Sequence, residues 1–360
     1  MAITHLVVDV SGHGYGYGHA AMTLPILNAL RHSLPKLKLT IRTSVPAAWL
    51  AERLWGQWDY LNHSDVGMTM VDSLHVRQYE SYLAYSTLHE SWNERVSDAA
   101  VHLSSLEPTL LLSNVPYLSI AAANKAGVPA IAMSSLNWAD VFYHYCGHLP
   151  GAKGIWQQMI DAYAAADIFL QLTPAMPMPS IRNGKELGAV ALLGKDRRTE
   201  LRQRFGWGED DIVALLTLGG IHTELPVAQW PRFGNVRLVI ESKSKYSHPD
   251  IRSSAELELP FIDLVRSCDL LISKPGYGIV TEAACNGIPI LLVSRPGWPE
   301  EACFRQWLGQ NGRMLTLTEQ KLRTGDFVAE IHAIRSMPSP SSPPPSGISE
   351  AVAILSQYLQ

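Results

Sequence analysis

The chain lacks the features that mark membrane-spanning, disulfide-stabilised and nucleic-acid-binding proteins. No apolar run approaches the roughly 20 residues that cross a bilayer, and the amino terminus has no basic segment followed by an apolar one, so no transmembrane segment is expected. The 4 cysteines form no Cys-x-x-Cys pair, which favours reduced thiols and a cytoplasmic protein. The formal net charge is −4 and Lys and Arg are scattered, so nucleic acid is not an expected partner.

The sequence also contains no Asp-x-Asp motif that could hold Mg²⁺. His144, Cys146 and His148 are metal-ligating residue types, but they alternate in a segment expected to be helical, where alternate side chains point apart. We therefore expect no metal and no cofactor.

What the sequence does contain is a glycine-bearing turn within residues 269–289. The apolar run Leu270 to Ile272 ends in a break that holds Gly276 and Gly278, and a short helical pattern follows until Gly287. This order indicates strand, tight turn and helix. We expect both turn glycines to take positive φ, and the free N–H groups that open the helix to bind a diphosphate.

Acidic residues near this turn complete a predicted nucleotide-sugar pocket. Glu282 lies in the first helical turn, where a carboxylate can accept both hydroxyls of a ribose. Glu300 and Glu301 follow the next apolar run and emerge at the same sheet edge, which suits donor hydroxyls. An ordinary βαβ unit whose glycines serve only packing has the same spacing, and that interpretation stays open.

A second glycine-rich loop follows the first predicted strand, Leu6 to Val10. Residues 11–19 read Ser-Gly-His-Gly-Tyr-Gly-Tyr-Gly-His, and alternate glycines suit the close approach of a ligand. His13 and His19 exchange protons near neutrality, so both are candidates for a general base. His13 has the better position, directly after the strand end. On the acceptor side we also place Gly12, Gly14 and Tyr15.

The most aromatic stretch is residues 137–148, Asn-Trp-Ala-Asp-Val-Phe-Tyr-His-Tyr-Cys-Gly-His. Aromatic faces stack on sugar rings while neighbouring polar groups bond the hydroxyls, so Asn137 and Trp138 are assigned to the acceptor. Asp140 has three interpretations: it orients a histidine base, it binds an acceptor hydroxyl, or it is the carboxylate of a helix start.

Three tryptophans, Trp49, Trp55 and Trp58, lie among leucines between residues 47 and 61. They fit either core packing or an amphipathic patch for peripheral membrane contact. Because an interfacial helix carries more Lys and Arg than this segment does, core packing is favoured.

Hydrophobic patterning predicts alternating strands and helices throughout, hence an α/β protein. Prolines in residues 173–179 favour a crossover between two domains there. A long helix is expected over residues 79–106. Beyond the segments given above, strands are predicted at residues 109–113, 128–133, 164–172, 212–218, 236–241, 256–259 and 290–294.

Several stretches resemble known sugar-nucleotide proteins. The turn from Lys274 to Glu282, with the Gly-Ile-Pro that follows it, is similar to the donor motif of GT-B glycosyltransferases of the undecaprenyl-muramyl-peptide GlcNAc transferase type. It resembles still more closely the glycosyltransferase-like amino-terminal region of plant L-arabinokinases, as do residues 12–16, 137–140, 177–179 and 300–301. The phosphate loop of the kinase half of those proteins is absent from this sequence, so sugar phosphorylation is not implied.

The resemblance implies a GT-B architecture, in which two Rossmann-like doubly wound domains face a cleft. We place the acceptor domain at residues 1–175, the donor domain at 190–335, and a Pro/Ser-rich linker at 336–347. The final helix, 348–360, would pack back on the first domain. By the resemblance, Gly219 and Gly220 face the donor, and Phe261 and Ile262 lie where the nucleobase is read. The other donor-binding candidates in the turn are Lys274, Tyr277 and Thr281.

These features predict an inverting, metal-independent glycosyltransferase that uses a nucleotide sugar, most commonly UDP-linked, and an acceptor that the sequence does not identify. Two alternatives stay open: an NDP-sugar 2-epimerase, and a non-catalytic module that binds sugar nucleotides. The sugar, the nucleobase and the oligomeric state are also left open.

Overall fold

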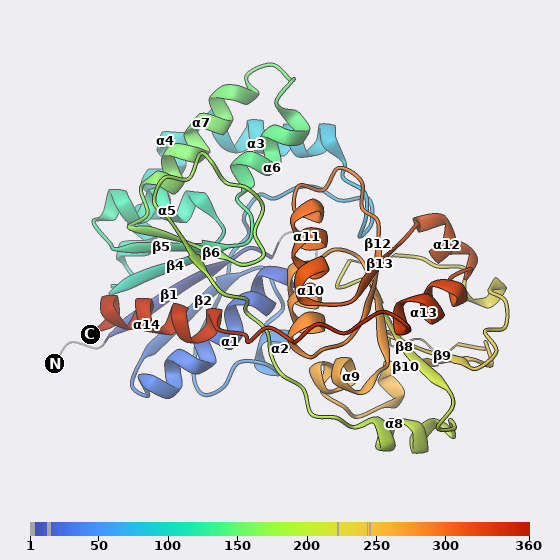
Figure 1. Ribbon diagram of the computed structural model, residues 1–360. Coiled ribbons are helices and arrows are strands. Elements are labelled where there is room, and N and C mark those ends of the chain that lie inside the picture. Colours follow the sequence, from blue (N-terminus) through green and yellow to red (C-terminus); the bar gives the residue numbers. More distant parts are fainter. Residues whose placement is uncertain (1–3, 13–15, 222, 243, 245) are drawn as a thin grey trace. The chain divides into compact units, whose positions relative to one another are not determined.

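The computed structural model describes residues 4–12, 16–221, 223–242, 244 and 246–360. The chain forms two compact units, one of Met1–Val190 with Ser346–Gln360 and one of Ala191–Pro345 (Figure 1). In each unit a fully parallel sheet alternates with helices along the chain, which confirms the predicted α/β class.

The sheet of the first unit has the strand order β3-β2-β1-β4-β5-β6-β7. Its central strands are apolar runs, and β1, β4 and β5 are buried along their whole length, as expected for parallel strands with helices on both faces. The strands are β1 (His5–Val10), β2 (Lys38–Thr43), β3 (Asp59–Asn62), β4 (Leu110–Asn114), β5 (Ala130–Ser134), β6 (Ile168–Leu172) and β7 (Gly184–Leu187).

Two helices from opposite ends of the chain pack together in this unit. The last helix, α14, lies against α1, as Figure 1 shows in red and blue. The N–H of Gly347 donates to the carbonyl of Ala189, and Glu350 accepts from the N–H of Gly188. The helices are α1 (Gly18–Ser33), α2 (Ala47–Ala51), α3 (Gln78–Glu90), α4 (Trp92–Ser104), α5 (Tyr117–Ala126), α6 (Trp138–Cys146), α7 (Ala152–Ala164) and α14 (Gly347–Leu359).

The sheet of the second unit has the order β10-β9-β8-β11-β12-β13. Its strands are β8 (Ile212–Thr217), β9 (Val236–Ile240), β10 (Ile251–Ser253), β11 (Leu270–Ser273), β12 (Ile290–Val293) and β13 (Met314–Leu317). Its helices are α8 (Arg198–Phe205), α9 (Phe261–Ser267), α10 (Tyr277–Cys285), α11 (Glu301–Asn311), α12 (Glu319–Thr324) and α13 (Val328–Arg335), with the 3₁₀ turns η2 (Val227–Gln229) and η3 (Ser254–Glu256).

Several predicted elements differ from the structure. The long helix expected over residues 79–106 is two helices, α3 and α4, that meet at Ser91. The strand expected at 256–259 is loop, because Ser253 and Glu256 close a reciprocal capping box that starts η3 instead.

The predicted crossover is also wrong. Residues 173–183 lead into β7, which pairs with β6, so the first sheet continues past residue 175 and the first unit extends to Val190.

The tryptophan segment is less buried than core packing predicts. Leu50 and Leu54 are buried, but Trp55 is 72% exposed. The guanidinium of Arg53 lies 4.1 Å from the ring centroid of Trp49, which places that ring at a polar surface.

Candidate functional site

In the second unit the strand order reverses between β8 and β11. Ligands of doubly wound sheets bind beyond the carboxyl ends of the strands at such a switch point. Thr217 at the end of β8 lies beside Ser273 at the end of β11. The residues that follow these two strands, as far as Gly219 after β8 and Gly276 after β11, therefore form neighbouring turns.

The side chain of Lys274 lies between these two turns. A Cβ atom on Gly276 would be 3.4 Å from the Lys274 ammonium nitrogen, and one on Gly219 would be 3.9 Å from it. Gly219 has a φ of 79°, a conformation that favours glycine. Gly276 is extended, with a φ of −130°, and neither it nor Gly278 has the positive φ expected from the sequence. The absence of a side chain at Gly276 leaves room for the lysine.

Helix α10 begins at Tyr277, earlier than the sequence indicated. The N–H of Val280 already donates to the carbonyl of Gly276, so the open N–H groups are those of the first turn before it. These groups and the partial positive charge of the helix start lie beside the Lys274 ammonium, which suits an anion.

Burial and the nearby charge of Arg295 lower the pKa of Lys274 to about 8, against a smaller opposing effect of Glu300. The Arg295 guanidinium lies over the Trp298 ring, 3.7 Å from its centroid. Two cations thus converge where the β11 and β12 turns meet, and an anionic ligand would relieve their repulsion.

A pair of carboxylates lies at the same sheet edge. Burial, with the charge of Glu241, raises the pKa of Glu282 to about 8. Glu241 follows β9 and accepts a hydrogen bond from the Thr217 hydroxyl. Carboxyl groups with a strongly shifted pKa, as Glu282 has, gather at functional positions.

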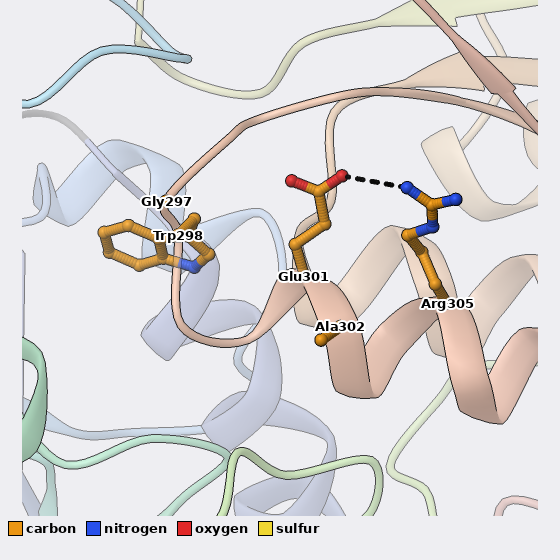
Figure 2. Close-up of a pocket in the computed structure, with 5 residues that line it drawn as sticks. All are labelled: Gly297, Trp298, Glu301, Ala302 and Arg305. Atoms are coloured by element: carbon orange, nitrogen blue, oxygen red, sulfur yellow. Dashed lines mark ion pairs between the residues drawn. The ribbon is translucent and has the colours of Figure 1, made fainter.

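Glu300 and Glu301 are both buried, and the structure gives each a partner within the protein. The Trp298 indole donates to Glu300, with a distance of 2.9 Å. Glu301 accepts from the N–H of Arg295 at 2.9 Å and pairs with Arg305 at 3.7 Å. Figure 2 shows this ion pair beside an open hollow lined by Gly297, Trp298, Glu301, Ala302 and Arg305. That hollow does not include Gly219, Lys274 or Gly276.

The other donor candidates occupy different environments. Phe261 and Ile262 open α9 and are partly exposed. Tyr277 is buried against Phe304, and Thr281 is fully buried with its hydroxyl bonded to the carbonyls of the preceding turn. Gly220 follows Gly219 in the exposed part of the β8 turn.

In the first unit the strand order reverses between β1 and β4, where Val10 pairs with Asn114. His19 lies in the first turn of α1, and its Nδ1 atom is 2.8 Å from Oδ1 of Asn114. The Asn114 amide nitrogen donates to Thr23 and to the His19 carbonyl, so its oxygen faces the ring. Nδ1 of neutral His19 therefore carries the proton, and Nε2 carries the lone pair that a general base requires.

Asp65, which the sequence did not indicate as a site residue, carries a negative charge that acts on His19. It accepts from the Ser11 hydroxyl at 2.6 Å and from the Gly12 N–H at 3.4 Å. Burial lowers the pKa of His19, while its bond to Asn114 and the charge of Asp65 raise it. Gly12 is buried, and a Cβ atom there would lie 2.8 Å from the N atom of Val45.

One ring of the aromatic stretch, residues 137–148, lies beside His19. Trp138 lies edge-on to His19, with 5.5 Å between ring centroids. Asn137 caps α6 and is fully buried. The Asp140 carboxylate accepts from Asn137 at 2.9 Å and from the Trp156 indole at 3.1 Å, which supports the helix-start interpretation. His13, Gly14 and Tyr15 lie outside the described residues.

Two further residues of the candidate sites, Asn114 and Glu241, could have been recognised from the sequence. Asn114 ends β4 and Glu241 follows β9, and polar residues at the carboxyl ends of buried strands mark a ligand-binding edge. Asp65 had no such signal, because it reaches the site from a loop.

Within the described parts of the chain, no group of three or more His, Cys, Asp or Glu residues has an arrangement that could hold a metal ion. None of the helices described has the length and apolar character needed to cross a membrane.

Solved structures with similar architecture decide the fold. The calicheamicin glycosyltransferase CalG4 matches with a TM-score of 0.60 and 14% identity, over 100% of this chain and 94% of that one. The Medicago truncatula protein UGT71G1, solved with UDP-glucose, matches with a TM-score of 0.57 and 12% identity, over 98% and 93%. The fold is GT-B. The spinosyn forosaminyltransferase SpnP also matches, with a TM-score of 0.59 and 13% identity over 99% and 95%.

Sequence similarity to curated proteins is weaker. No protein-family profile matches the chain. The L-arabinokinase of Arabidopsis thaliana is 24% identical over an alignment of 326 residues, and the match covers 84% of this chain. The chain spans 30% of the length of that protein. The GT-B fold and a distant likeness to L-arabinokinase are thus shown, while the muramyl-peptide transferase type is not.

Proposed function

We propose that this protein transfers a sugar from a nucleotide sugar, UDP-linked, to an acceptor hydroxyl, with inversion and without a metal ion. The position of Lys274 between two glycine turns at the start of α10 is the observation that carries the proposal. A diphosphate there would meet an ammonium group, a helix start and open backbone N–H groups. The structural neighbours, which include a protein solved with UDP-glucose, support the assignment.

Each part of a donor has a candidate partner in the second unit. The diphosphate would bind Lys274 and the first turn of α10, and the ribose hydroxyls would bind Glu282. The nucleobase would lie at Phe261 and Ile262, and the sugar at Glu300. Gly219 and Gly220 would border the diphosphate.

In the first unit His19 would act as general base. Its Nε2 atom takes the proton of the acceptor hydroxyl as the oxygen attacks the anomeric carbon. The bond from that carbon to the diphosphate oxygen breaks, and the electron pair leaves with the diphosphate. Attack from the face opposite the leaving group inverts the anomeric centre. Trp138, edge-on to His19, would contact the acceptor.

A non-catalytic module that binds sugar nucleotides is the second candidate. The similarity to L-arabinokinase favours it, because the chain matches only part of that larger protein.

A nucleotide-sugar screen by thermal shift, followed by mass spectrometry of the mixtures with an acceptor panel, tests these assignments. Ligands that bind the folded state raise the melting temperature. Release of UDP with a glycosylated acceptor supports transfer. Selective binding without turnover favours the module, and a sugar altered at C2 identifies an epimerase. No response to any nucleotide sugar contradicts the proposal.

A further inference from the structure

The hydroxyl of Tyr163 in α7 joins the two segments that flank His19. It donates to the carbonyl of Val115 at 2.8 Å and accepts from the N–H of Trp138 at 3.2 Å. Tyr163 is fully buried, and its ring packs edge-on against Phe169 of β6 with 5.5 Å between ring centroids. One firmly held hydroxyl therefore connects the loop after β4 to the start of α6.

Each segment bonded by this hydroxyl carries a group that contacts His19. Val115 follows Asn114, whose amide oxygen lies 2.8 Å from Nδ1 of the imidazole. Trp138 presents its own ring from the other segment, with 5.5 Å between the two ring centroids. Tyr163 thus bonds the backbone of both segments, at Trp138 itself and one residue from Asn114.

The two backbone groups that Tyr163 bonds are buried and lie outside the regular hydrogen bonding of strand and helix. Trp138 is the first residue of α6, where an N–H group has no carbonyl of its own helix to bond. Val115 lies between β4 and α5, so its carbonyl lies beyond the end of the strand. Buried backbone groups without partners are costly, so loss of the hydroxyl would shift both segments.

We propose that Tyr163 is a positioning residue for sugar transfer, whose hydroxyl fixes Asn114 and Trp138 about the His19 ring. The inference rests on the proposed role of His19 as base and adds the residue that sets its surroundings. Tyr163 acts through these two neighbours and keeps the ring in the tautomer whose Nε2 takes the acceptor proton. A ring that loses its bond to Asn114 can carry its proton on Nε2, and it then cannot act as a base at that atom.

The tautomer of His19 tests the inference in the full-length protein without ligand, at a pH where the ring is neutral. The ¹⁵N NMR shifts of an imidazole distinguish a protonated ring nitrogen from an unprotonated one. The parent should carry the proton on Nδ1, and Tyr163→Phe should show a mixture of the two tautomers. A substitution that only lowers stability would keep the parent tautomer in its folded state.

Two other buried tyrosines of the first unit supply matched controls. Within the described parts of the chain the Tyr85 hydroxyl has no hydrogen-bond partner, and the Tyr117 hydroxyl lies 2.9 Å from Nε2 of His89. Tyr85→Phe therefore removes an unbonded hydroxyl, and Tyr117→Phe removes a bonded one. Neither hydroxyl bonds the segments beside His19, so both variants should keep the parent tautomer.

Where transfer is measured, Tyr163→Phe should lower turnover about tenfold. UDP affinity should stay within about twofold, because the donor candidates lie in the other unit. The tautomer measurement needs no substrate, so it gives its answer whether or not sugar transfer is found.

The parent tautomer in Tyr163→Phe would overturn the inference alone, and so would an equal change in Tyr117→Phe. A parent ring protonated at Nε2 would overturn the assigned base as well. If Tyr163→Phe does not fold, hydrogen exchange of the Trp138 amide in the parent decides. Slow exchange supports its bond to Tyr163, and exchange as fast as in an open first helical turn overturns the inference.

Discussion

The Nδ1 atom of His19 and the Oδ1 atom of Asn114 lie 2.8 Å apart, and this contact decides which ring nitrogen is free. Asn114→Leu, similar in volume, removes the acceptor and should lower turnover by roughly 10–100-fold with unchanged donor affinity. Asn114→Asp keeps an acceptor at Nδ1 and adds a charge, so it should retain activity and move the acidic limb to higher pH. Steady-state kinetics across pH measure both. Equal loss in the two variants would show that the amide does more than hold the ring.

His19→Ala should lower turnover by a factor of roughly 10²–10⁴, because the acceptor proton loses its base. UDP affinity, measured by calorimetry, should stay within twofold, since the donor candidates lie in the other unit. His32→Ala, exposed at the far end of α1, is the matched control and should behave like the parent. If His13→Ala loses turnover and His19→Ala does not, the base lies in the loop outside the described residues.

The rate of the parent should fall as pH drops through the pKa of His19, because imidazolium cannot accept a proton. Burial lowers this pKa below that of a free histidine, so the fall should come at more acidic pH than about 6.5. A profile without an acidic limb would remove His19 from the mechanism.

Lys274→Met should weaken UDP binding about tenfold or more and leave uridine binding unchanged, since the lysine is assigned to phosphate. Lys195→Met, at an exposed lysine of the same unit, serves as control. Calorimetry with both ligands separates the outcomes. Equal losses for uridine and UDP would mean that Lys274 supports the fold of the turns and not the anion.

Glu282→Ala should weaken UDP and uridine alike, on the order of tenfold, because both ligands carry the ribose. The exposed Glu209→Ala is the control. Unchanged uridine affinity in a folded Glu282→Ala protein would remove the ribose assignment.

The raised pKa of Glu282 also makes a stability prediction. Its pKa is about 8 in the folded protein and about 4.5 in an unfolded chain, so the folded state binds more protons between these values. The unfolding free energy should therefore fall as pH rises through this window, on the order of 3 kcal/mol for this group. In the Glu282→Gln variant the free energy of unfolding should not show this decrease as the pH rises. Denaturant unfolding at pH 5 and pH 8, for parent and variant without nucleotide, measures the difference.

The sequence predicted those parts of the fold that apolar runs reveal. Strands β1, β4, β5, β8, β9, β11 and β12 are buried on both faces, and their runs stand out. Strands at the margins of each sheet are short or mixed in composition: β3 is largely unburied, and β10 has three residues. These strands form because they pair with a neighbouring strand, and the local sequence pattern carries no information about that pairing.

The residues of the candidate site were predictable to a similar extent: those next to apolar strands could be recognised from the sequence, and a residue on a loop could not. Lys274, Glu282 and His19 lie in or after glycine-bearing turns that follow strands, and the sequence indicated all three. For Asp140 the sequence left three interpretations open, and the structure favours the helix start, because its carboxylate accepts hydrogen bonds from Asn137 and Trp156. Asp65 lies 46 residues from His19 along the chain, and only the folded loop brings its charge near.

The hydrogen bond from the N–H of Gly347 to the carbonyl of Ala189 has a consequence for how the polypeptide can be divided. The chain leaves the first unit just after Ala189 and returns just before Gly347, at one place, so the second unit is an insertion within the first. A short linker from residue 190 to residue 346 would close the first unit without strain. Such an excision would leave His19, Asn114 and Asp65 on one continuous polypeptide, and the Lys274 turns on another.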